Sequence, residues 1–131
     1  MKKTIRQTVT FDASPHDVFE LLMDSKKHSK FTNASARISR KAGGAISIFD
    51  NWITGKNLEI VTDKRIVQSW RAELENWSED YFSKVTFILE KDGKKTRLRF
   101  IHSGVPEQHY QSLKEGWYEH YWNPMKLMLN K

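Results

Sequence analysis

GVPEQHYQSLKEGWYEHYWNPMKLMLNK, residues 104–131, is the stretch that decides the fold. After the Gly-Val-Pro loop signal, apolar residues return at the spacing of one broad helical face. The two rows of that face are Leu113, Trp117, Tyr121, Met125 and Met128, then Tyr118, Trp122 and Leu129. A helix from about Gln108 to Asn130 would be roughly 34 Å long at about 1.5 Å per residue. The pattern therefore predicts a carboxy-terminal helix that crosses a whole small domain.

Gly116 and Pro124 interrupt this helical pattern. Glycine inside an exposed helix costs about 1 kcal/mol relative to alanine, so Gly116 indicates the close approach of a strand or a ligand. Proline in a helix interior removes a backbone hydrogen bond, so Pro124 predicts a bend after Trp122. The aromatic side chains on the covering face have polar edges. Such a face can line a cavity as well as fill a core.

The residues before this helix predict an antiparallel sheet. Alternation of apolar and polar residues marks a strand at residues 4–11. Six further strands are expected at residues 36–42, 46–49, 52–61, 66–73, 81–90 and 96–103. Their short connections favour a meander, and Asp92-Gly93 is the clearest hairpin turn. The strand at residues 36–42 carries several charges, which favours an edge position.

Each late strand has one apolar face. Val85, Phe87 and Leu89 share a side of one strand. Leu98, Phe100 and His102 share a side of the next. Side chains two residues apart point to the same face of a strand. The apolar face needs a cover, and the carboxy-terminal helix is the segment of matching length.

Two short helices are predicted between the first and second strands. Ser14 can cap the first of them, Pro15 suits its first position, and Asp17 completes a capping-box pattern. The second is expected at residues 24–32, with Asp24 or Ser25 as its cap.

Length and composition favour a small intracellular domain. The 131 residues fit one domain, residues 1–131. The chain has no cysteine, which excludes a disulfide framework, cysteine nucleophiles and thiolate metal sites. We find no signal peptide and no window long enough to span a membrane. A cytoplasmic monomer or homodimer that does not bind membranes is expected.

The positive charge raises a nucleic acid or an anionic surface as a partner. The net charge is +6 and the pI is near 9.6. The basic residues are interpreted as scattered pairs with acids nearby, such as Lys26-Lys27, Arg40-Lys41, Lys64-Arg65 and Lys94-Lys95. No helix-turn-helix, zinc or aromatic RNA-binding motif accompanies them. A solubilising surface is therefore favoured, and no nucleic-acid partner is predicted.

The order strand, two short helices, six strands and long helix comes with motifs spread over nearly the whole chain. They include Phe11-Asp12-Ala13-Ser14-Pro15, Phe31-Thr32, Gly43-Gly44, Thr54-Gly55, Asp63-Lys64-Arg65-Ile66-Val67, Trp70-Arg71, Thr96-Arg97-Leu98, Gly104-Val105-Pro106, Gly116-Trp117 and Tyr121-Trp122. In this order they resemble the helix-grip fold of the START-like (SRPBCC) superfamily. Within it, the chain resembles the homologues of the activator of the 90-kDa heat-shock protein ATPase.

This resemblance implies an α+β fold. A curved antiparallel sheet of six to seven strands would wrap around the long carboxy-terminal helix, with two short helices after the first strand. The eukaryotic co-chaperone of the family contains a similar unit as the carboxy-terminal half of a larger protein, which implies a stress-response role with the 90-kDa heat-shock chaperone as partner. Other relatives in the superfamily bind lipids, hormones or polyketides under the helix, and some are cyclases or dehydratases.

A ligand cavity is the leading site hypothesis. Its predicted lining is Trp70, Phe87, Phe100, His102, Trp117, Tyr118 and Tyr121. These aromatics, with Trp52 and Trp122, can stack on a ligand or fill a core, and both interpretations stay open. His102 can anchor a ligand, act as an acid or base, or be a hydrogen-bonded core histidine.

Metals and cofactors are not predicted. His109 and His120 are eleven residues apart, which separates them by roughly 16 Å along a straight helix. No HExxH motif, cofactor fingerprint or catalytic triad is present. Trp77, in a loop at residues 75–79, is expected to be the most exposed tryptophan.

Three functions remain, in order of preference. The first is a non-enzymatic protein that holds a small hydrophobic or amphipathic ligand between sheet and helix. The second is a co-chaperone that binds the 90-kDa heat-shock protein through a basic outer surface. The third is a cyclase or hydratase with His102 as its acid or base.

Overall fold

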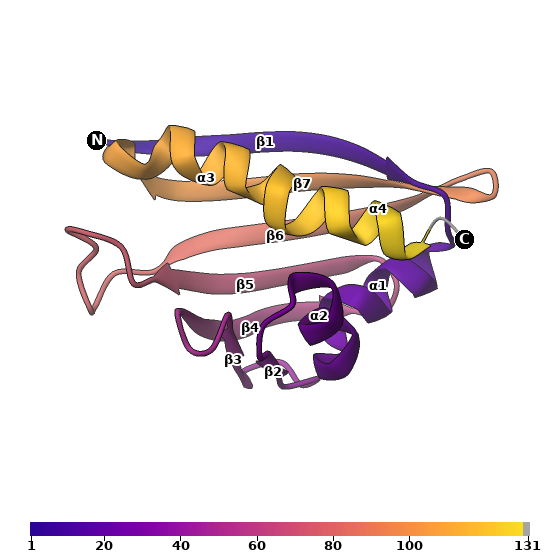
Figure 1. The fold of residues 1–131 in the computed structure, drawn as a ribbon, viewed down its shortest axis with the longest axis horizontal. Helices are drawn as coiled ribbons and strands as arrows, with labels where there is room; N and C mark the ends of the chain where they lie inside the picture. The colour runs from indigo at the N-terminus through magenta and orange to yellow at the C-terminus, as the bar shows by residue number, and fades with distance from the viewer. Residues whose placement is uncertain (130–131) are drawn as a thin grey trace.

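A seven-stranded antiparallel sheet with helices on one face makes up the computed structural model, which describes residues 1–129 (Figure 1). The strand order is β1-β7-β6-β5-β4-β3-β2, so every strand after β1 pairs with its neighbours in the chain. The strands are β1 (Lys2–Phe11), β2 (Arg37–Ile38), β3 (Ala45–Ile48), β4 (Ile53–Val61), β5 (Arg65–Ala72), β6 (Ser83–Asp92) and β7 (Lys95–Pro106). The predicted meander is confirmed, and β1 is added beside β7.

A helical run crosses the sheet diagonally, and two short helices lie alongside its carboxy-terminal half, on the side of β4 to β2 (Figure 1). The short helices are α1 (Pro15–Met23) and α2 (Ser25–Thr32). The long run consists of a 3₁₀ turn η1 (Glu107–His109), α3 (Tyr110–Trp117), a π-helical turn η2 (Tyr118–Trp122) and α4 (Asn123–Leu129). This confirms the predicted carboxy-terminal helix. Its predicted last residue, Asn130, lies outside the described residues.

The π turn is the feature of this helix that the sequence pattern did not predict. The backbone N–H of Asn123 donates to the carbonyl of Tyr118, five residues back. Pro124 follows immediately and has no N–H for a normal helical bond. The disturbance that we expected at Pro124 thus takes the form of a widened turn just before it.

The predicted capping residues begin both short helices. The Ser14 hydroxyl accepts a hydrogen bond from the backbone N–H of Asp17 at 3.2 Å. Asp24 Oδ1 accepts one from the backbone N–H of Lys27 at 2.9 Å. These bonds satisfy N–H groups that have no partner within the helix.

Strand β2 is much shorter than the predicted strand at residues 36–42. The side chain of Asn57, fully buried on β4, donates to the carbonyls of Ser39 at 2.6 Å and Lys41 at 3.1 Å. Gln68 in turn donates to the Asn57 side-chain oxygen at 3.0 Å. Residues 39–44 are therefore held as a loop by side-chain bonds, and β2 remains as a short edge strand.

The core lies between the sheet and the long helix. The alternation predicted for β6 and β7 is confirmed, and Phe87 pairs with Phe100 across the two strands. Gln7 of β1 fastens the helix, because its side chain donates to the Lys114 carbonyl at 2.8 Å and accepts from the Trp122 indole N–H at 2.7 Å. The sheet and helix are thus joined by packing and by a buried polar bridge.

Candidate functional site

Six of the seven predicted cavity residues meet between the sheet and the helix. We call them the aromatic cluster: Trp70 from β5, Phe87 from β6, Phe100 and His102 from β7, Trp117 from α3 and Tyr121 from η2. The Trp117 ring centroid lies 4.4 Å from that of Phe100, 4.6 Å from Tyr121 and 5.7 Å from Trp70. At these separations the rings pack against one another directly.

Tyr118, the seventh predicted residue, does not join them. It is 42% exposed, on the outer side of the helix. It follows Trp117 by one residue, which turns its side chain by about 100° from the inward direction. The second apolar row of the helix therefore reaches the sheet through Trp122 and not through Tyr118.

The expectation for Trp77 is wrong. Trp77 is only 5% exposed, whereas Trp52 is 40% exposed. The Trp77 ring packs on Trp70 with centroids 5.8 Å apart, and its indole N–H donates to the Tyr81 carbonyl at 2.9 Å. The loop after β5 thus folds back over one end of the aromatic cluster.

His102 is the polar centre of the cluster and is completely buried. Trp117 Nε1 donates to His102 Nδ1 at 3.1 Å, so the proton of the neutral ring must be on Nε2. Nε2 then donates to the Ser83 hydroxyl at 2.7 Å, and that hydroxyl donates to the Trp70 carbonyl at 2.9 Å. Burial lowers the pKa of His102 to about 3. This geometry holds the ring neutral with both nitrogens occupied.

A second buried histidine, His28 on α2, was not predicted from the sequence. Its Nδ1 lies 3.2 Å from the Leu22 carbonyl and its Nε2 lies 2.8 Å from the Tyr121 hydroxyl. Nδ1 therefore donates to the carbonyl, and Nε2 accepts from Tyr121. Burial lowers the pKa of His28 to about 4 and raises that of Tyr121. Because His28 lies in a lysine-rich helix, no sequence signal distinguished it from a surface residue.

The space left beside the aromatic cluster is small. A cavity of about 60 Å³ lies between the helix and the β3–β4 region, and its walls are entirely apolar. It is lined by Phe49, Trp52, Ile53, Trp70, Leu113, Gly116, Trp117, His120 and Tyr121. Ligand pockets commonly measure about 300–1,000 Å³. In this arrangement the interior is a packed core with a minor void.

Gly116 borders that void, but a closely packed strand does not explain why a glycine stands there. A Cβ at this position would meet no atom closer than 3.8 Å, on His120. The predicted close approach of a strand is therefore absent, and the missing side chain leaves room at the mouth of the cavity.

Trp70, whose ring lines the same space, carries an unusual polar group. Its indole N–H is buried and has no hydrogen-bond partner among residues 1–129. An unpaired buried donor is costly, which makes this group the natural anchor for an acceptor atom.

Residues 1–129 contain no group of three or more histidine, aspartate or glutamate side chains placed to hold a metal ion. No helix in this described part of the chain has both the length and the apolar character that a membrane crossing needs.

The arrangement defines a class of protein. An antiparallel sheet that grips a carboxy-terminal helix, with two short helices after the first strand, is the helix-grip fold of START-like proteins. The model of the family described as activator of Hsp90 ATPase homolog 1-like protein matches residues 12–130. This chain belongs to that family.

Proteins with similar sequences carry names from the same family. A Dictyostelium discoideum protein named activator of 90 kDa heat shock protein ATPase homolog is 31% identical over 116 residues, which are 88% of this chain and 30% of that protein. A human protein, activator of 90 kDa heat shock protein ATPase homolog 1, is 27% identical over 95% of this chain and 36% of its own length. This chain therefore spans about a third of these relatives.

A solved structure shows the same fold at nearly full length. A protein described as an HSP90 activator from Plasmodium falciparum superposes with a TM-score of 0.87 and 22% sequence identity. The match covers 96% of this chain and 95% of that one.

Proposed function

We propose that this protein binds the 90-kDa heat-shock chaperone and acts through its outer surface. The observation that carries the proposal is the small size of the space beneath the helix, about 60 Å³. For comparison, an engineered apolar cavity that binds benzene measures roughly 150 Å³. The aromatic cluster therefore serves, in this arrangement, to hold the helix on the sheet, and recognition falls to the surface.

The comparisons support the proposal from a second side. Relatives that carry the name of a 90-kDa heat-shock protein ATPase activator align along most of this chain. The Plasmodium falciparum protein described as an HSP90 activator has almost the same extent as this chain. On this proposal, residues 1–131 act as one START-like domain in the cytoplasm. The absence of cysteine agrees with a reducing compartment.

Titration of the purified chaperone with this protein tests the proposal. We expect binding at low salt that weakens as salt rises, because contacts between exposed charges are screened. The chaperone's ATPase rate, measured in the same titration, shows whether binding also stimulates hydrolysis. Absence of binding at low salt would remove the proposed function.

A second candidate is a small apolar ligand held in a widened form of the cavity. Two observations favour it: the cavity wall is wholly apolar, and the Trp70 indole N–H has no partner among residues 1–129. Such a ligand would carry one hydrogen-bond acceptor, and the helix would have to move outwards. The six residues of the aromatic cluster would then line the widened site.

Thermal denaturation with a panel of fatty acids and polyketides tests this candidate, since a ligand that binds the folded state raises the melting temperature. Trp70→Phe keeps the ring and removes the donor, so it should weaken an acceptor-bearing ligand. No shift with any member of the panel would count against the ligand site and would leave the chaperone proposal untouched.

A further inference from the structure

Residues 25–47 carry the whole excess of positive charge in this chain. Their six basic residues are Lys26, Lys27, Lys30, Arg37, Arg40 and Lys41, and they include no aspartate or glutamate. The chain has 22 basic and 16 acidic residues, so taking away these six leaves 16 of each sign elsewhere. The basic residues, interpreted above as scattered pairs, are thus concentrated in this segment.

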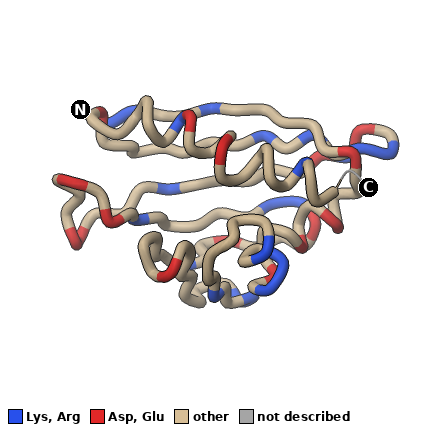
Figure 2. Tube along the Cα trace, viewed as in Figure 1, with Lys and Arg blue, Asp and Glu red and all other residues tan. Residues whose placement is uncertain are grey.

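The fold gathers these cations at one corner. Helix α2, β2 and the loop to β3 lie together at the end of the sheet farthest from β1, and Figure 2 shows basic positions grouped there. All six basic residues are exposed. A shallow groove of about 370 Å³ runs beside Lys26 and Lys30 and is also bordered by Ser25, Ser29 and Ala36.

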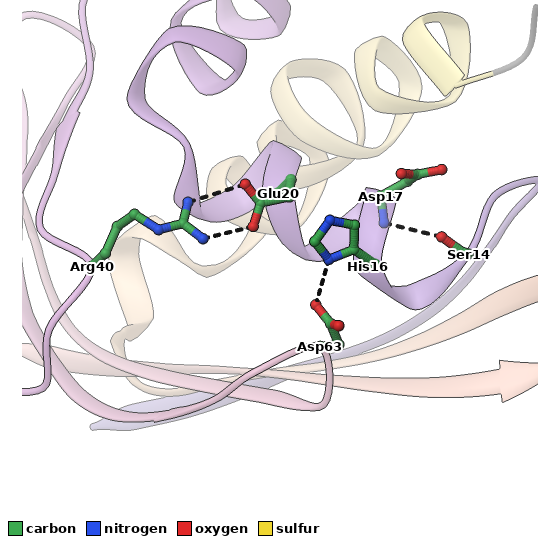
Figure 3. A network of polar contacts seen from close by, with 6 residues as sticks. All are labelled: Ser14, His16, Asp17, Glu20, Arg40 and Asp63. Atoms are coloured by element: carbon green, nitrogen blue, oxygen red, sulfur yellow. Dashed lines mark hydrogen bonds and ion pairs between the residues drawn. The ribbon is translucent and has the colours of Figure 1, made fainter.

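Five of the six cations form no ion pair among residues 1–129. Arg40 is the exception, because its guanidinium donates to both carboxylate oxygens of Glu20, at 3.2 and 2.6 Å (Figure 3). We call the other five the basic surface: Lys26, Lys27, Lys30, Arg37 and Lys41. Asp24 caps the same helix by accepting a hydrogen bond from the backbone N–H of Lys27, and Asp12 and Asp17 line a separate groove with Lys27 and Lys30.

The lysines of the basic surface occupy positions in α2 that do not favour folding of the helix. Lys26 and Lys27 lie in the first turn of α2, where the helix dipole disfavours positive charge. Lys26 and Lys30 are four residues apart on the same helix, which makes a repulsive like-charge pair. Both costs would be relieved by a negatively charged partner on the basic surface.

We propose that the basic surface docks an acidic segment of a protein partner, one with several carboxylates in succession. This inference rests on the proposed function, in which the partner is the chaperone. Residues 25–47 include none of the exposed large hydrophobic side chains. Single-stranded nucleic acids stack on aromatic side chains and interfacial helices insert apolar ones, so a carboxylate-rich protein segment fits this surface best.

The experiment compares two variants that remove equal charge. One is Lys26→Gln/Lys30→Gln/Lys41→Gln, on the basic surface. The matched control is Lys91→Gln/Lys94→Gln/Lys95→Gln, around the β6–β7 hairpin, where the side chains are also exposed. Each is titrated with the chaperone and, separately, with a fluorescent poly-glutamate peptide at low salt. Thermal melts confirm that both variants fold.

We expect the basic-surface variant to bind chaperone and peptide about tenfold more weakly than wild type, and the control within about twofold. Equal binding of the two variants to the chaperone would refute the proposal that the basic surface is the docking site. It would not contradict the proposed function. Peptide binding that depends on the basic surface, without chaperone binding by wild type, would refute the proposed function and support the surface. Tighter binding to duplex DNA or phosphatidylserine vesicles than to poly-glutamate would overturn the choice of a protein partner.

Discussion

The two buried histidines make the stability of this protein depend on pH in a definite direction. Burial lowers the pKa of His28 to about 4 and that of His102 to about 3, from an ordinary value of 6.5. Below about pH 6.5 the unfolded chain binds a proton at each site, and the folded chain does not. The free energy of unfolding must therefore fall as the pH falls from about 6.5 towards 4.

The size of this effect follows from the two pKa values. Each histidine contributes about 1.4 kcal/mol per pH unit within the window. Between about pH 7 and pH 5 the loss is about 2 kcal/mol per histidine and about 4 kcal/mol for the pair. The total stability of a small domain is about 5–15 kcal/mol, so the loss is a large fraction of it.

Substitution of either histidine should halve the loss of unfolding free energy between pH 7 and pH 5. His102→Gln removes one titrating group, so the difference in stability between pH 7 and pH 5 should fall to about 2 kcal/mol. Urea unfolding followed by tryptophan fluorescence measures this difference. His120→Gln, at an exposed position, is the matched control and should keep the wild-type difference. A His102→Gln protein that still lost the full amount would refute the reasoning, whatever its stability at pH 7.

Three further substitutions test the packing. Gly55→Ala should cost about 3 kcal/mol or more, since its Cβ would lie 1.8 Å from the Ser69 carbonyl oxygen; a urea midpoint equal to wild type would contradict this. Gly116→Ala should leave stability unchanged or raise it by up to about 1 kcal/mol in thermal unfolding, because the nearest contact is at 3.8 Å. Gln7→Leu should cost about 2 kcal/mol or more by urea unfolding, because it leaves the Trp122 indole N–H unpaired; an unchanged midpoint would show that the bridge to the helix contributes nothing.

Local chemistry was sufficient to predict most of the fold. Ser14 and Asp24 cap the two short helices as expected, because capping depends on residues only a few positions away. The inward alternation at Phe87 and Phe100 was also readable, since side-chain direction in a strand has a period of two. The broad apolar face of residues 108–129 predicted the covering helix, because helical periodicity is also a local property of the sequence.

Features that depend on contacts between distant segments were not predictable. Asn57 shortens β2 through bonds to a loop 16 and 18 positions away. The buried His28 forms a hydrogen bond with the hydroxyl of Tyr121, which lies 93 positions along the chain. The aromatic character of the inner face was correctly anticipated, but residue types alone cannot tell a filled interior from a hollow one. That difference depends on how closely the rings pack.

The pairing of β1 with β7 has a consequence for how the protein is made. Gln7 in β1 bonds to partners 107 and 115 positions later in the chain. Synthesis proceeds from the amino terminus, so β1 leaves the ribosome long before β7 and the helix exist. The first strand to be translated is therefore the last strand to gain its partner, and a ribosome stalled before β7 would leave β1 open to aggregation.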